Sequence, residues 1–229
     1  MTKKSTKLKV SLAAALLGAA LTAGTIYAAD EPAELNADSV EYSMKTGVIT
    51  ATGNVVMKRG TATVTGAKAT YNTKTKEGMV SGGVTAVKDD MRMTSALVKS
   101  DGENHMYASG SVHAVKGDKT FDGERVDYYP DKEYILIENG GRVTSPEGVF
   151  TANHMEGWLK EDHIRGTGDA HIISPPKNLE AGGYQADYYG KEKGKAVLTG
   201  HAWAIQNNNL MKSEKLTIYL ADDGNAKVQ

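Results

Sequence analysis

The chain has 229 residues, of which 27 are basic and 28 are acidic, and it contains no cysteine. Without cysteine there is no disulfide framework, no thiolate metal site and no cysteine nucleophile, so stability must come from hydrogen-bonded structure and apolar packing. All 28 acidic residues follow position 29, whereas four of the 27 basic residues precede it, so residues 30–229 carry a net charge of −5. Nucleic acid and anionic membrane surfaces are poor partners for such a chain.

Residues 1–29 have the composition of a secretory signal peptide. Four lysines lie within the first nine residues, the apolar stretch 10–23 follows, and Ala28 and Ala29 provide small residues for cleavage. This pattern predicts a signal peptide over 1–29. The alternative is an uncleaved membrane anchor, because the apolar run approaches the lower limit for a spanning helix. The remaining residues, 30–229, show no shift in composition and are predicted to form a single domain.

Short segments of alternating polarity and turn residues recur after the signal. In the first copy, residues 38–43 alternate, 44–47 supply a turn, and 48–58 alternate again. Clusters of Gly, Asn, Asp and Pro, or charged pairs, mark further turns at 72–76, 101–104, 130–132, 161–162 and 191–194. Each repeat therefore predicts two strands and two turns, and helical periodicity is absent.

A Gly-x-Val or Gly-x-Ala phrase sets the period of the repeat. Its six copies begin 27 to 32 residues apart, at Gly53, Gly82, Gly110, Gly141, Gly168 and Gly200. A second phrase, a small residue followed three positions later by an apolar one, begins at Ala37, Gly66, Ser95, Gly123, Ala152, Gly183 and Ser213. A period in this range predicts one supersecondary unit stacked on copies of itself. The chain is therefore predicted to be all-β and built from about seven two-strand repeats.

Counting by two along each strand predicts which side chains share the inner face. This parity places the glycine and the Val or Ala of each phrase on that same inner side. The inner face is apolar but small, since Ala, Val and Gly dominate it. Such a stripe suits a groove filled by another molecule, and the alternative is an ordinary core that packs Ala on Val. The predicted inner positions include Val40, Tyr42, Ile49, Ala51, Val55, Ala69, Tyr71, Val80, Val84, Met106, Ala108, Val112, Val126, Tyr128, Ile137, Val143, Ile164, Ala170, Leu198 and Ala202.

Four tyrosines occupy equivalent inward positions in different repeats, namely Tyr42, Tyr71, Tyr128 and Tyr188. Stacking of the repeats would align them in a row. Such a row can cap a core with its hydroxyls at the rim, or it can line a path for acyl chains. The sequence leaves both interpretations open.

The sequence contains no motif for catalysis or cofactor binding. A nucleophile elbow and a phosphate-binding loop are absent. The six histidines lack the compact spacing of metal ligands. Adjacent carboxylates such as Asp89 and Asp90 fall at turns, and neighbours on a strand point to opposite faces, so they would not converge as an acid and a base. We therefore predict no catalytic residue, no metal site and no cofactor.

The repeat, the signal and the absence of a catalytic motif together resemble the LptA/OstA family of periplasmic lipopolysaccharide-transport proteins. The phrases that carry the resemblance are Ala37-Asp38-Ser39-Val40-Glu41-Tyr42 and Gly53-Asn54-Val55, which are echoed through the chain. The resemblance implies a folded-over antiparallel sheet, an open β-jellyroll of taco shape. It also implies that the inner positions form a groove for lipopolysaccharide acyl chains while the sugar stays in water.

Members of this family are thought to join head to tail through edge strands. The resemblance implies a bridge between an inner-membrane LptC-like protein and an outer-membrane LptD-like protein, together with head-to-tail homo-oligomers. Unpaired strand edges favour this mode of assembly, because they are templates for strand addition. The predicted edges are residues 34–42 and 212–220.

Three other interpretations remain open at this stage. If the signal is retained, the membrane-anchored LptC-like relative of the same pathway is the better match. A right-handed β-helix that acts on or binds polysaccharide would also repeat, but its coils are shorter and it would not need the alternating hairpin turns. A repeat-built surface adhesin or stalk would contain no ligand in its sheet.

Overall fold

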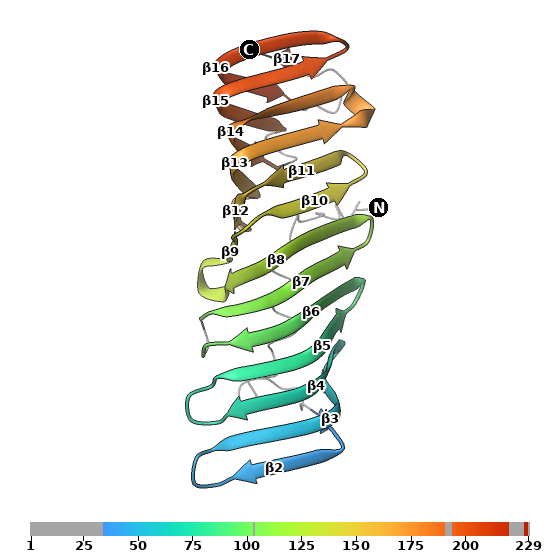
Figure 1. Ribbon diagram of the computed structural model, residues 1–229, viewed down its shortest axis with the longest axis vertical. Coiled ribbons are helices and arrows are strands. Elements are labelled where there is room, and N and C mark those ends of the chain that lie inside the picture. The colour runs from blue at the N-terminus through green and yellow to red at the C-terminus, as the bar shows by residue number, and fades with distance from the viewer. Residues whose placement is uncertain (1–33, 103, 191–193, 220–226, 229) are drawn as a thin grey trace, which may run out of the picture.

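The computed structural model describes residues 34–102, 104–190, 194–219 and 227–228, which form one tall stack of antiparallel strands (Figure 1). The predicted signal peptide lies outside the described residues. No helix in the described part of the chain is long and apolar enough to cross a membrane. The prediction of an all-β, folded-over antiparallel sheet is confirmed.

Seventeen strands make up the sheet within these residues. In chain order they are β1 (Glu34–Asn36), β2 (Ser39–Ser43), β3 (Val48–Arg59), β4 (Ala62–Asn72), β5 (Gly78–Lys88), β6 (Met91–Ser100), β7 (Met106–Lys116), β8 (Lys119–Tyr129), β9 (Tyr134–Ile137), β10 (Gly141–Ser145), β11 (Gly148–Ala152), β12 (His154–Trp158), β13 (His163–Ser174), β14 (Leu179–Tyr189), β15 (Lys195–Gln206), β16 (Asn209–Tyr219) and β17 (Lys227–Val228). Two short 3-10 turns follow β8 and β13, at Pro130–Lys132 and Pro175–Lys177.

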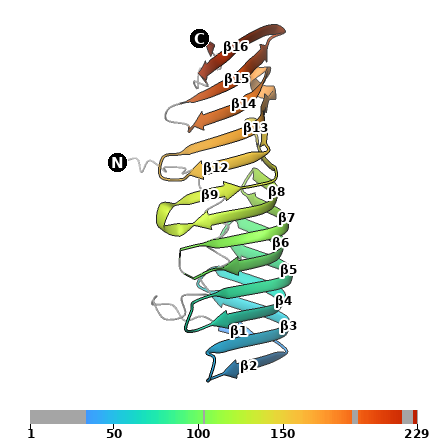
Figure 2. The same cartoon turned by 60° about the vertical axis from the view of Figure 1, so that its left-hand side comes forward.

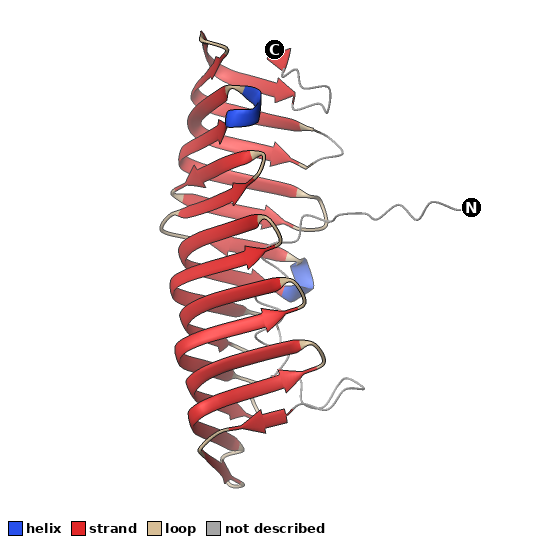
Figure 3. Ribbon diagram, turned by 90° about the vertical axis from the view of Figure 1, so that its right-hand side faces the viewer, coloured by secondary structure: helices blue, strands red, loops and turns tan. Residues whose placement is uncertain are grey.

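Each long strand folds back once near its middle, so the stack has two walls. Wall B contains the halves nearest β2, such as Val48–Thr52 of β3 paired with residues 68–72 of β4. Wall A contains the other halves, such as 55–59 of β3 paired with 62–66 of β4. Figure 3 shows these strands from the side, each folded back on itself. We call one such crossing of both walls, whether by one strand or by two short ones, a pass.

Three passes are split into two separate strands, one for each wall. β1 and β2 both pair with β3, and β11 and β12 both pair with β13. β10 and β9 both pair with β8. Figure 1 shows β10 and β11 between β8 and β13 on wall A, and Figure 2 shows β9 and β12 between the same neighbours on wall B. The predicted two-strand repeat is therefore a pair of folded passes.

A β-bulge produces the bend in every second pass. Between the pairs Thr52–Lys68 and Val55–Gly66, β3 has one residue more than β4. The two residues of β3 at this point, Gly53 and Asn54, have φ values of +74° and +46°. A bulge that begins with a left-handed glycine increases the local twist and bends the strand. Similar left-handed pairs begin at Gly82, Gly110, Asn139, Gly168 and Gly200.

The structure corrects the position of the fourth copy of the Gly-x-Val phrase. The left-handed pair there is Asn139 and Gly140, with φ of +64° and +91°, whereas the predicted copy began at Gly141 inside extended β10. The Gly-x-Val pattern has glycine at its first position, but Asn also tolerates left-handed φ. With Asn139 in place of Gly141, the first four steps of the period are all 28 or 29 residues.

The second phrase supplies the partner that the bend requires. Val55, Val84 and Val112 lie directly across from Gly66, Ser95 and Gly123, which are the first residues of their phrases. A Cβ on Gly66 would lie 2.7 Å from Val80 Cγ1 and 3.0 Å from the Ser81 carbonyl oxygen. Small residues are therefore needed because the adjacent strand approaches closely where it bends.

The glycine of the Gly-x-Val phrase faces the outside of the bend, contrary to the parity prediction. A Cβ on Gly82 or Gly110 would lie 2.5 Å from the Cβ of Ala67 or Ala96, and both alanines are exposed. The Val or Ala two positions later is buried, as expected. Parity fails at the glycine because the two left-handed residues interrupt the alternation.

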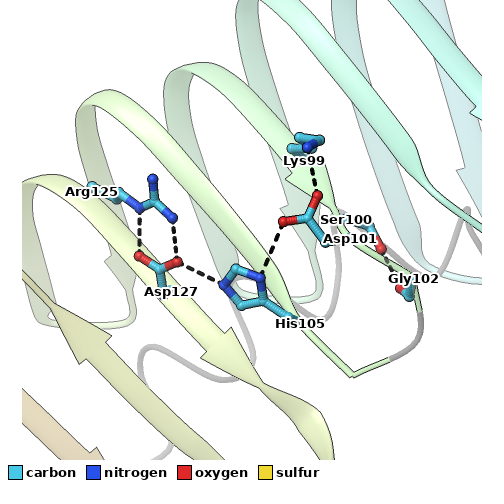
Figure 4. Close-up of polar contacts among 7 residues, drawn as sticks. All are labelled: Lys99, Ser100, Asp101, Gly102, His105, Arg125 and Asp127. Atoms are coloured by element: carbon cyan, nitrogen blue, oxygen red, sulfur yellow. Dashed lines mark hydrogen bonds and ion pairs between the residues drawn. The ribbon is translucent and has the colours of Figure 1, made fainter.

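Histidine–aspartate pairs strengthen the outer face of wall B at two places. In the first, His105 Nε2 lies 2.7 Å from Asp127 Oδ1, and Arg125 Nε donates to Asp127 Oδ2 at 2.6 Å (Figure 4). Asp101 lies on the other side of the His105 ring and also pairs with Lys99 at 2.6 Å. The carboxylate of Asp127 is nearly enclosed, and these partners satisfy it.

The second place repeats this arrangement two folded repeats later. His163 Nε2 lies 2.7 Å from Asp187 Oδ1, and Arg165 Nε donates to the same oxygen at 2.8 Å. Burial opposes ionisation of Asp187, but hydrogen bonds from Gln185, Arg165 and His163 outweigh it and lower the pKa of the carboxyl.

An aromatic ladder connects the two networks. Centroid distances of 4.5 to 5.8 Å link the rings of successive strands, in the order His105, Tyr129, Tyr134, Trp158, His163 and Tyr189. Each such contact adds about 0.5–1.5 kcal/mol beyond its buried area. The ladder crosses β9 and β12, the short strands of wall B, and so reinforces the wall where its passes are split.

Substitution of the two glycines in one bend should separate backbone strain from steric overlap. Gly82 and Gly83 have φ of +84° and +72°, but a Cβ at Gly83 meets no atom within 4 Å. Gly83→Ala should cost about 1 kcal/mol of unfolding free energy from left-handed strain alone. Gly82→Ala should cost about 2–4 kcal/mol, since its Cβ also collides with Ala67. Urea unfolding measures both values.

The double variant Gly82→Ala/Ala67→Gly provides the control for this pair. Removal of the Ala67 methyl group relieves the overlap, so a double-mutant cycle should give a favourable coupling energy. Equal destabilisation by the two single alanine variants would contradict the outward orientation of Gly82.

Asp187→Asn should destabilise the fold in a pH-dependent manner. The change leaves His163 and Arg165 without an anionic partner in a nearly buried site and should cost roughly 3 kcal/mol at pH 7. Because the pKa of Asp187 is lowered by folding, its contribution is present above the ordinary value of 3.8 and is lost as pH falls through the native pKa. The difference between wild type and variant should therefore shrink below pH 3.8.

Asp122→Asn is the matched control for Asp187→Asn. Asp122 also pairs with a histidine, His113, at 2.6 Å, but both side chains are about half exposed. Solvent screening should hold its effect below about 1 kcal/mol. Similar losses for the two aspartates, measured by urea unfolding, would contradict the structural role of the buried network.

Candidate functional site

The interior between the two walls forms a continuous apolar core along the described stack. On wall B the pairing register brings one inward residue from each pass into a continuous row. Buried members of this row are Ala51, Ala69, Val80, Val98, Ala108, Val126, Ile137, Met155, Ala186, Leu198 and Leu216. All are apolar, and all are at most 6% exposed.

A second row on wall A faces this one across the interior. Its residues are Met57, Val64, Ala86, Met93, Ala114, Phe121, Val143, Phe150, Ile172, Ala181, Ala204 and Met211. Its members belong to the hydrophobic core or pack against it. The two-residue count along the second strand of each repeat reaches Met57, Ala86, Ala114, Val143, Ile172 and Ala204 of this row, but not the other six members. Those six residues each precede the small residue of a second phrase by two positions, so the same count continued backwards from that residue would have included them.

Most of the predicted groove residues are buried between the walls. The buried ones are Ala51, Val55, Ala69, Val80, Val84, Met106, Ala108, Val112, Val126, Tyr128, Ile137, Ala170, Leu198 and Ala202. Partly buried positions are Ile49, Tyr71, Val143 and Ile164. Val40 and Tyr42 are 50% and 55% exposed, because β2 is the last described strand at its end of wall B.

The predicted tyrosine row lies on wall B near the mouth, by which we mean the edge of the two walls opposite the bend. Tyr42 and Tyr71 both pair with Ile49, and Tyr128 and Tyr188 occupy the same row on β8 and β14. They are separated by smaller or aliphatic residues rather than stacked on one another. Burial raises the pKa of Tyr128 and Tyr188, so both phenols remain neutral at physiological pH.

The buried carboxylates lie on the outside of the walls. The buried charged side chains of the described residues, Asp127 and Asp187, belong to the outer networks of wall B. Buried Ser95 and Ser100 donate to backbone carbonyl oxygens. The described residues contain no group of three or more His, Asp or Glu that could hold a metal ion. The two apolar rows can therefore bind apolar groups.

The predicted edges are also placed by the structure. Residues 34–42 form β1, a bend and most of β2, and in the described chain these strands pair only with β3. Residues 212–219 form most of β16, whose last residues Ile218 and Tyr219 pair with Val228 and Lys227 of β17. β17 thus covers one end of the second edge, and residue 220 lies outside the described residues.

Comparison with solved structures finds LptH of Pseudomonas aeruginosa, described as the LptA homologous periplasmic component of the conserved lipopolysaccharide transport device. The two chains share 16% identity over 70% of this chain and 77% of LptH, with a TM-score of 0.19. The comparison with curated proteins gives no match. The model of the family "LptA/(LptD N-terminal domain) LPS transport protein" matches residues 34–163, more than half of the chain. The chain therefore belongs to this family of lipopolysaccharide-transport proteins.

Proposed function

We propose that this protein carries lipopolysaccharide across the periplasm, with the acyl chains held between the two walls and the sugars in water. The observation that carries the proposal is the pair of apolar rows, which extend without a charged residue from β3 to β16. Membership of a transport family supports the same function. No chemical reaction is required, and the direction of transport must be set by energy supplied elsewhere.

The way the walls are joined is suited to the entry of acyl chains. The strand pairings run along the stack within each wall, as between β3 and β4 on either side of the bend. The two walls meet through apolar side chains, and covalent continuity is at the bend. Separation of the walls at the mouth would therefore break side-chain contacts without breaking the strand ladder. Each methylene transferred from water to the interior would return about 0.8 kcal/mol.

The ends of the stack support a role as one segment of a longer bridge. At the β2 end the apolar row of wall B continues to Val40 and Tyr42, whose exposure leaves the row open to an adjoining sheet. An edge strand can add a strand of another chain through its free backbone groups. We propose LptC-like, LptD-like or identical subunits as the partners at these ends. Fourteen passes at about 4.8 Å would give a length of about 65 Å.

Photo-crosslinking at two neighbouring positions would test whether lipid lies between the walls. Tyr42 and Glu41 are adjacent and both exposed, but Tyr42 has inward parity and Glu41 has outward parity. A photoreactive residue at Tyr42 should crosslink to lipopolysaccharide in living cells, and one at Glu41 should not. Tyr71 and Thr70 form the same pair of faces one repeat further along the stack.

Complementation of growth by each variant shows that the labelled protein is active. Equal crosslinking at Glu41 and Tyr42 in active variants would indicate adsorption to the surface. No crosslink from either inward position would contradict transport between the walls.

We further propose that residues 1–29 are removed on export and that 30–229 act as one soluble domain. N-terminal sequencing of protein recovered from the periplasm should begin at Asp30, since Ala28 and Ala29 precede it. Retention of the N-terminal segment in a membrane fraction would instead favour the anchored LptC-like role.

A further inference from the structure

A row of cationic side chains follows the mouth of wall A in the N-terminal half of the stack. Lys88 of β5 pairs with Met91 of β6, Met91 pairs with Lys116 of β7, and Lys116 pairs with Lys119 of β8. Arg59 of β3 occupies the same place, opposite Ala62 of β4. Cross-strand neighbours are separated by about 5 Å, so the three lysines lie within about 15 Å along the mouth.

The lysines have the inward parity of the apolar rows. Lys88 and Lys116 follow buried Ala86 and Ala114 by two positions, and Lys119 precedes buried Phe121 by two. All three lysines are partly buried. Met91, which lies between Lys88 and Lys116, is only 4% exposed although it begins a strand next to a turn. Lysine can cover an apolar neighbour with its aliphatic stem while its ammonium group stays in water, which is consistent with the partial burial of Lys88 and Lys116 on either side of Met91.

Lys88, Lys116 and Lys119 form no ion pair in the part of the chain that the structure describes. The ion pairs of Lys99, Arg125, Lys160 and Arg165 lie elsewhere, and Lys88, Lys116 and Lys119 take part in none within 4 Å. Lys116 and Lys119 are direct cross-strand neighbours, an arrangement of like charges that destabilises a sheet. Asp89, Asp90 and Asp118 lie in the same two turns, and a Cβ on Gly117 would lie 3.9 Å from Asp90 Oδ2. None of these carboxylates forms an ion pair with the three lysines within 4 Å in the described residues, so the ammonium groups can donate to an external anion.

The row is also restricted to one part of the mouth. The corresponding positions on β13 to β16 are Ser174, Leu179, Gln206 and Asn209, which carry no charge. The opposite mouth, on wall B, contains Tyr71, Met106 and Tyr128 along β4 to β8. A molecule at the mouth between β5 and β8 would therefore meet ammonium groups on one side and phenol or thioether groups on the other, with the apolar rows beneath.

We infer that Lys88, Lys116 and Lys119 bind phosphate groups on the headgroup of the transported lipid. This inference rests on the proposed function, because the acyl chains must lie between the walls for the headgroup to reach the mouth. Lysine binds phosphate as a point charge through flexible ammonium donors. The adjacent ammonium groups of Lys116 and Lys119 fit one phosphate, and Lys88, on the other side of Met91, can reach a second one.

Binding of phosphorylated and dephosphorylated lipid A to the purified protein would test this assignment. The triple variant Lys88→Gln/Lys116→Gln/Lys119→Gln should lower affinity for diphosphorylated lipid A by about tenfold to a hundredfold. Its affinity for the dephosphorylated lipid should stay within about twofold of wild type, since acyl-chain burial is unchanged. Added salt should lower the affinity of the wild type for the phosphorylated lipid towards that of the triple variant. It should not change the affinity for the dephosphorylated lipid.

A matched triple on the outer faces controls for net charge. Lys58, Lys68 and Lys212 are exposed and have outward parity, and Lys58→Gln/Lys68→Gln/Lys212→Gln should leave both affinities unchanged. The variant Lys88→Arg/Lys116→Arg/Lys119→Arg should retain binding. Circular dichroism melting confirms folding, and relief of lysine repulsion predicts no loss of stability in the inner triple.

Several outcomes would overturn the assignment. Equal losses for the two lipids, no loss, or equal effects of the inner and outer triples would each exclude a phosphate site at this mouth. Saturable, lysine-dependent binding of inorganic phosphate without an effect on the lipid would reassign the row to a free anion. If wild type binds both lipids equally, the phosphate site fails while the proposed function stands. If it binds neither lipid, the proposed function fails as well.

Discussion

The left-handed bulge in alternate passes is the constraint on which the rest of this structure depends. Without it, strands of 11 or 12 residues would form a broad single-layered sheet with one apolar face in water. Two consecutive residues of positive φ, such as Gly53 and Asn54, fold the pass onto itself. Because the bulges recur at the same register, the folds align into one line along the stack. Every pass then contributes to both walls.

This arrangement divides the stabilising interactions into two classes. Backbone hydrogen bonds connect passes along the stack, whereas apolar contacts connect the walls across the interior. The first class is directional and must remain intact for the sheet to persist. The second is non-directional and can be exchanged for contacts with another apolar molecule of similar volume. The outer networks around Asp127 and Asp187 add strength to wall B without placing charge in the interior.

The period and parity of the sequence predicted the fold class and most buried positions of wall B, because both depend on local geometry. Val80, Ala108 and Leu198 lie inside, as an alternation of two requires. The prediction failed at particular residues for identifiable reasons. Asn139 replaces glycine at a left-handed position, so the fourth copy was misplaced. The bulge breaks the alternation, so the orientation of glycine could not be obtained by counting.

Other features depend on which strands become neighbours, and sequence patterns do not contain that information. The contact between His163 and Asp187 joins residues 24 positions apart, and the ladder through Trp158 needs the pairing of β9 with β12. The row formed by Lys88, Lys116 and Lys119 is also a product of register, because each lysine alone resembles an ordinary solvated residue beside a turn.

The small residues of the two repeated phrases acquire a structural explanation that narrows where ligand recognition can occur. Gly66, Gly123 and Gly183 are required by close packing within and between neighbouring strands at the bend, so their size is not itself evidence of a groove. A ligand has more room as the distance from the bend increases, since the walls are joined there and free at the mouth. Acyl chains would thus exchange with the apolar rows beyond the bend, and selectivity for a headgroup must come from the mouth. In the described residues, the inward positions at the mouth of β4 to β8 change from apolar to cationic on wall A and to aromatic on wall B.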